Sequence, residues 1–128
     1  METLMNKTFT NEIKLPHTHN PDTLKLLSEK PEDEIFSVVS GTFALISDSS
    51  RLKILWLLCH TEECVMNIAA AVGMSSPAVS HHLRILKTAE LITGRKKGKE
   101  VYYTLSNSEE AVLVHKIVDS IFDINCKK

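Results

Sequence analysis

The chain has 128 residues, of which 43% are hydrophobic and 24% charged, a size and composition typical of one globular domain. No apolar run approaches the roughly 18 residues that a membrane-spanning helix needs, and residues 1–15 lack the pattern of a secretory signal. We therefore expect a cytoplasmic protein without membrane contact, in which three cysteines, too few for a disulfide scaffold, are thiols or metal ligands.

Charge is unevenly distributed along the chain. The formal net charge is −1, yet residues 79–99 carry a net charge of +5 and residues 1–37 a net charge of −3. A local basic patch on a nearly neutral chain is typical of a nucleic-acid binder whose other faces are acidic. A solvated lysine surface would give the same totals, so charge alone leaves both interpretations open.

The first half of the chain predicts an arm followed by two helices. Residues 1–30 contain two prolines and one short apolar cluster, which predicts a flexible arm with about one helical turn. Pro31 and the acidic residues after it favour a helix that continues to Ile46, and the serine-rich stretch 47–50 offers caps for a helix from Arg51 to His60. We therefore expect an arm over 1–30 and one domain over 31–128.

The second half predicts a helix-turn-helix and a hairpin. A helix over 65–72 ends at Gly73, and a cap at Ser76 opens a helix that runs to residue 88. Strands over 92–95 and 101–105 flank a turn at Gly98, and a helix follows over 108–125. The expected fold is mostly α with a small β-hairpin wing, which is a winged helix-turn-helix.

In such a fold the second helix of the pair enters the major groove and the wing follows the DNA backbone. Val79, Leu83 and Leu86 have the spacing of a core-facing stripe, so the polar residues between them should point outward. We expect base contacts from the helix and phosphate contacts from its amino end and the wing. The predicted DNA-binding residues are Ser75, Ser76, Ser80, His81, Arg84, Lys87, Arg95, Lys96, Lys97 and Lys99.

The last helix has apolar residues on more than one face, which would leave apolar surface in water if the chain were monomeric. We therefore expect a homodimer. The predicted interface residues are Ile35, Val39, Ile117, Ile121 and Phe122.

Three stretches resemble the ArsR/SmtB repressors over about residues 34–123: SDSSRLKIL at 47–55, VSHHLRIL at 79–86 and RKKGKEVYY at 95–103. The resemblance implies a homodimeric repressor that binds double-stranded operator DNA and releases it when an inducer, usually a metal ion, binds. It does not imply an enzyme, and nothing in the sequence supplies a substrate cleft for Cys64 and His60 as nucleophile and base.

The metal sites of such repressors fit this chain only in part. The positions of the SmtB-type zinc site hold Asn107, Glu109, Ser120 and Asp123, without its two histidines. Where cadmium and arsenic sensors have Cys-Val-Cys, this chain has Cys64, Val65 and Met66, so a three-thiolate site lacks a ligand.

We expect an inducer site for a zinc-, cadmium- or copper-type divalent ion at Cys64. Its expected partners are His17 and His19 of the arm, with Cys59 or His60 as a fourth ligand. A second candidate is His115, Asp119 and Asp123, which share one helical face. Each set also has an interpretation without a metal. His17 and His19 would then be surface residues, Cys64 a core residue, and His115, Asp119 and Asp123 an exposed stripe.

The other functional hypothesis is a thiol-, redox- or persulfide-responsive repressor. It would use Cys59, Cys64 and Cys126, with Cys126 pairing with one of the other two thiols on oxidation. A cysteine on an apolar helix face is more often a packing residue. Two outcomes separate the hypotheses: release of DNA by metal under reductant supports a metal inducer, and release only on oxidation supports the thiol mechanism.

Overall fold

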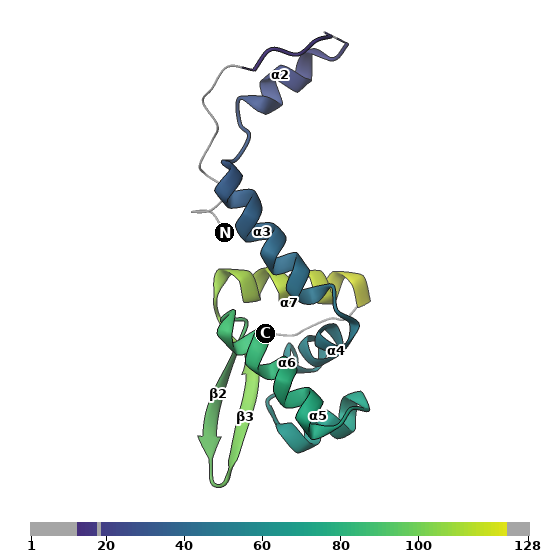
Figure 1. Ribbon diagram of the computed structural model, residues 1–128, viewed down its shortest axis with the longest axis vertical. Helices are drawn as coiled ribbons and strands as arrows, with labels where there is room; N and C mark the ends of the chain where they lie inside the picture. The colour runs from purple at the N-terminus through teal and green to yellow at the C-terminus, as the bar shows by residue number, and fades with distance from the viewer. Residues whose placement is uncertain (1–12, 18, 123–128) are drawn as a thin grey trace. The chain divides into compact units, whose positions relative to one another are not determined.

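The computed structural model describes residues 13–17 and 19–122, which divide into two compact units, 1–42 and 43–128 (Figure 1). The boundary falls inside α3 (Asp33–Ile46), twelve residues beyond the expected end of the arm. The expected division at residue 30 stays a prediction. Among the described residues, none of the helices is long and apolar enough to cross a membrane.

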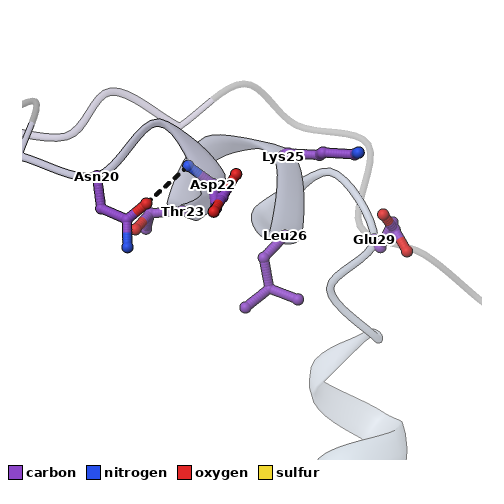
Figure 2. A pocket seen from close by; sticks show the side chains of 6 residues that line it. All are labelled: Asn20, Asp22, Thr23, Lys25, Leu26 and Glu29. Carbon is purple, nitrogen blue, oxygen red and sulfur yellow. Dashed lines mark hydrogen bonds between the residues drawn. The ribbon is translucent and has the colours of Figure 1, made fainter.

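The first unit contains α2 (Pro21–Leu27) and the amino-terminal part of α3. Asn20 caps α2, because its Oδ1 accepts a hydrogen bond of 2.9 Å from the backbone N–H of Asp22 (Figure 2). A surface cavity of about 390 Å³ lies along this helix and is lined by Asn20, Asp22, Thr23, Lys25, Leu26 and Glu29. Its mixed, exposed lining does not single out a class of ligand.

The second unit continues with α4 (Ser49–Leu58), α5 (Val65–Val72), α6 (Ser76–Thr88) and α7 (Glu109–Phe122). Asp48 caps α4 by accepting the Arg51 N–H at 2.9 Å, and this hydrogen bond lowers the pKa of the Asp48 carboxyl. The Arg51 side chain also donates to the carbonyl of Leu45, so one residue fastens the start of α4 to the end of α3.

The core of this unit is formed by all four of these helices and by the start of β2 (Ile92–Lys97). Trp56 of α4 lies outside this core and is 43% exposed. The core includes Ile54, Leu55, Leu58, Cys59, Ile68, Val79, Leu83, Leu86, Leu91, Ile92, Ala111, Val114 and Val118.

β2 pairs in antiparallel fashion with β3 (Glu100–Leu105), and the hairpin projects away from the helices (Figure 1). Gly98 forms its turn at a φ of +65°, a conformation that glycine adopts without strain. A third strand, β1 (Glu63–Cys64), pairs with the other edge of β3, so the strand order is β1-β3-β2. The sequence did not predict β1.

The turns at the ends of α5 and α6 use the same backbone motif with different residues. Gly73 ends α5 at a φ of +72°. Glu90 follows α6 at a φ of +62°, where the N–H of Glu90 bonds to the carbonyl of Lys87 and that of Leu91 to the carbonyl of Leu86. With α5, α6 and the β2–β3 hairpin all present, the predicted fold class is confirmed.

Candidate nucleic-acid interface and metal-ligating cluster

The amino end of α6 is fixed by a serine cap. The Ser75 hydroxyl accepts the N–H of Ala78 at 3.3 Å, which places the cap one residue earlier than predicted. The hydroxyl hydrogen of exposed Ser75 remains available to donate to a phosphate, and half-buried Ser76 lies beside it. Backbone N–H groups at such a helix end favour an anion.

The faces of α6 separate as the sequence predicts. Val79, Leu83 and Leu86 are at most 3% exposed. On the outer side Ser80 is half-buried, and His81, Arg84 and Lys87 are exposed. The helix can therefore present one hydroxyl, one imidazole and two cations to base edges and phosphates.

The wing carries three exposed lysines around its glycine turn: Lys96, Lys97 and Lys99. Lys97 lies over the ring of Tyr102, with its Nζ 5.6 Å from the ring centroid. Tyr103 packs against the core, and its ring would lie about 3.0 Å from a Cβ atom at Gly94, so this glycine allows close packing of the ring on β2.

Arg95 differs from these lysines because it has an intramolecular partner. Its Nε and Nη2 each lie 2.7 Å from a carboxylate oxygen of Glu62, in the loop before β1. The hydrogen bond to Glu62 raises the pKa of Arg95, and the same hydrogen bond lowers the pKa of Glu62. Its predicted role on DNA therefore competes with this ion pair.

The two described cysteines are both buried, at 7% exposure each. Cys64 is the N-cap residue of α5, but its thiol makes no capping hydrogen bond. The Glu63 carboxylate lies there instead, accepting from the Cys64 N–H at 3.2 Å and from the Asn67 side chain at 2.8 Å. Cys126 lies outside the described residues.

His17 and His19 stack on each other, with ring centroids 5.1 Å apart. They belong to the first unit and Cys64 to the second, so their predicted joint site with Cys59 or His60 stays a prediction.

The structure brings together a different set of ligand side chains. His60 Nε2 lies 2.9 Å from Asp119 Oδ1, and His115 Nε2 lies 3.2 Å from Asp119 Oδ2. Within the residues that the structure describes, these three form the group able to hold a metal, with ligand atoms all within 4.8 Å of one another. His60, which was predicted as a partner of Cys64, therefore lies beside His115 and Asp119 of the second candidate set. Asp123, the third member of that set, lies outside the described residues.

The predicted dimer residues differ in exposure. On α7, Ile121 is 70% and Phe122 46% exposed, and Ile117 is half-buried. On α3, Val39 is half-buried and Ile35 is 8% exposed, and the part that these residues take in a dimer stays a prediction. An apolar surface cavity of about 640 Å³ lies between Trp56 and Phe122.

Comparisons with known proteins agree on one family. Residues 48–93 match the model of the bacterial regulatory protein arsR family. The transcriptional regulator KmtR of Mycobacterium tuberculosis is 34% identical over 73% of this chain and 68% of its own length. The cadmium resistance regulatory protein CadC of Listeria innocua is 44% identical over 54% of this chain, which spans about 59% of that protein.

A solved structure from Mycobacterium bovis shares the fold. It is a homodimeric winged helix-turn-helix DNA-binding domain of a possible ArsR-family regulator. It superposes with a TM-score of 0.60 at 29% identity, covering 70% of this chain and 82% of that chain. These relatives are transcriptional regulators and not enzymes.

Proposed function

Since this chain belongs to the arsR family of bacterial regulatory proteins, we propose that it represses transcription by binding double-stranded operator DNA as a homodimer. An inducer, a divalent metal ion of the zinc, cadmium or copper type, releases the DNA. The observation that carries the proposal is the exposed row of His81, Arg84 and Lys87 on α6, followed along the chain by a wing with exposed lysines.

Exposed apolar surface and DNA geometry support the proposed dimer. Ile121, Phe122 and Trp56 expose between 43% and 70% of their surface, and a second copy would remove this surface from water. Two α6 helices related by a two-fold axis would then face major grooves roughly 34 Å apart. The homodimeric relative from Mycobacterium bovis supports the same assembly.

The metal inducer is supported by the relatives and by the ligands of this chain. CadC is named for cadmium resistance, and this chain has histidine, cysteine and carboxylate groups in two candidate sets. One is Cys64 with His17, His19 and Cys59 or His60. The other is His115 and Asp119, with Asp123.

The test starts from operator selection out of a random duplex library, followed by competition with random DNA. Arg84→Ala should weaken the selected duplex by about 1–3 kcal/mol and relax sequence preference, because a base contact is lost. Lys96→Ala should weaken all duplexes alike, because its partner is phosphate. Equal losses on selected and random DNA for both variants would contradict base reading by α6.

The inducer is then tested on the same complex. Zinc, cadmium and copper are titrated under reductant, and a disulfide or persulfide donor is added in a metal-free sample. Release by metal under reductant supports the proposal. Release only on oxidation would overturn the metal inducer in favour of the thiol mechanism at Cys59, Cys64 and Cys126.

A further inference from the structure

We propose that His60, His115 and Asp119 of one chain form a binding site for a divalent cation of the zinc type. As a metal site this stands on the geometry of the three side chains. As the inducer site it also rests on the proposed function. The site connects the turn after α4 with α7 inside one subunit, and it uses neither cysteine.

The orientation of His60 is set by the backbone. Its Nδ1 lies 2.7 Å from the carbonyl oxygen of Trp56, so Nδ1 carries the hydrogen of that bond and Nε2 is directed at Asp119. Metal-binding histidines are commonly held in this way, with the second ring nitrogen donating to a carbonyl. The His60 ring is therefore held in the orientation that a metal ligand needs before any ion binds.

α7 supplies the other two ligands from successive turns. His115 and Asp119 are four residues apart, so their side chains lie on one face of the helix. The His60 and His115 rings are nearly perpendicular, at 83°, with centroids 5.5 Å apart, and both Nε2 atoms converge on the two oxygens of Asp119. Each Nε2 atom thus faces a carboxylate oxygen, and a metal ion would bind at these nitrogens in place of any hydrogen there.

The spacing suits a small ion after modest side-chain movement. Tetrahedral zinc binds nitrogen and carboxylate oxygen at about 2.0–2.2 Å, which places its ligand atoms roughly 3.4 Å apart. The present separations range from 2.9 Å for the closest pair up to the 4.8 Å limit of the group. An ion would therefore have to draw the more distant ligand atoms closer together by about 1 Å.

The ligand chemistry selects the class of ion. Two imidazoles and a carboxylate suit zinc, cobalt, nickel and copper, whereas soft ions such as arsenite require thiolates. The three side chains are 14–23% exposed, so an ion can reach them from solvent. Three protein ligands leave a fourth position open, and His115 and Asp119 also line a surface cavity of about 460 Å³ that can hold water.

The site also lies close in sequence to Glu62, the residue whose carboxylate binds Arg95 of the wing. His60 precedes Glu62 by two residues, and Glu62 holds Arg95 of β2. The intervening Thr61 accepts a hydrogen bond of 3.2 Å from Thr104 of β3 through its carbonyl. Pulling His60 toward α7 would therefore act on a short loop that is bonded to both long strands of the wing.

The experiment measures metal binding by the full chain without DNA, with cobalt(II) as the spectroscopic probe. Wild type should give the visible ligand-field bands of a low-coordinate site but no near-ultraviolet thiolate charge-transfer band, because its ligands are nitrogen and oxygen. Absence of ligand-field bands, or a thiolate band abolished by Cys64→Ser, would overturn the site.

Variants then assign the ligands. His115→Gln and Asp119→Asn should each weaken cobalt and zinc binding by more than the roughly 10–100-fold typical for loss of an outer hydrogen-bond partner. His81→Ala, which removes an exposed histidine from α6, is the matched control and should leave metal affinity unchanged. Equal affinity in wild type and in folded His115→Gln would refute the assignment.

The inducer role is tested separately from the site. Zinc should release wild-type chain from the selected operator duplex and should fail to release Asp119→Asn. If zinc binds with the expected spectrum while the DNA complex persists, the metal site stands and its inducer role is wrong. If no sequence-specific DNA complex forms, the proposed function fails, and the cobalt measurements still decide the site.

Discussion

Replacing one wing lysine should change the salt dependence of DNA binding by an amount that follows from the structure. Lys96 is exposed next to the glycine turn, and a homodimer has two wings, so Lys96→Ala removes two charges from the complex. Each phosphate neutralised makes the slope of log K against log salt more negative by about 0.9, so the slope of the variant should be less negative than that of wild type by about 1.8. Between about 50 and 200 mM salt, the ratio of wild-type to variant affinity should then change about twelvefold.

Arg95→Ala is the matched comparison on the same strand. Because Glu62 compensates the Arg95 charge through two hydrogen bonds of 2.7 Å, this substitution should flatten the slope less than Lys96→Ala does. Glu62→Gln should steepen the slope, because it leaves the Arg95 charge uncompensated near the DNA backbone.

The assay is fluorescence anisotropy on a random-sequence duplex over a series of salt concentrations, so that no operator is needed. Sedimentation confirms that each variant has the same assembly state as wild type. If Arg95→Ala flattens the slope as much as Lys96→Ala, and Glu62→Gln has no effect, the ion pair opens on DNA and the reasoning is wrong.

Three further predictions concern assembly and stability. Ile121→Asp places a charge on a side chain that is 70% exposed, so sedimentation should show monomers, and a variant that remains dimeric would move the interface elsewhere. Glu90→Gly relieves a left-handed backbone, so the free energy of unfolding in urea should stay level or rise by up to about 1 kcal/mol, whereas Glu90→Val should lower it; the reverse order would contradict the strain. The lowered pKa of Glu62 means that its ion pair stabilises the fold above the ordinary carboxyl pKa and is lost as pH falls through the lowered value. Wild type and Glu62→Gln should therefore differ in urea midpoint at neutral pH and converge in acid, and a constant difference would exclude this pair as the cause.

The sequence predicted those elements whose signals are local. Gly73 and the Ser-Pro pair at 76–77 are adjacent in the chain to the helix ends that they define, so α5 was predicted with its observed bounds and α6 within one residue of its cap. α4 begins two residues earlier than predicted, because Asp48 and not a later serine supplies the cap. Glu90 occupies a left-handed position where glycine is the usual residue, so the sequence did not predict this turn.

Contacts between residues that are far apart in the chain could not be predicted from the spacing of residue types along the sequence. β1 has two residues, and its partners in β3 lie about forty positions later. Glu62 and Arg95 are 33 residues apart, and His60 and Asp119 are 59 apart. Helical spacing did place His115 and Asp119 on one face, but only packing of α4 against the rest of the core brings His60 to them.

The central position of β3 has a mechanical consequence for induction. β3 bonds to the outer strand of the wing on one side and to Glu63 and Cys64, at the entrance of α5, on the other. The strand pairings therefore connect the hairpin to the start of α5, and we expect the wing to move together with the α5–α6 helix pair. We expect an inducer to release DNA by changing the distance or angle between the two α6 helices of the proposed dimer, with the wing and the helix pair of each chain moving together, so that the two helices no longer match one helical turn of the duplex.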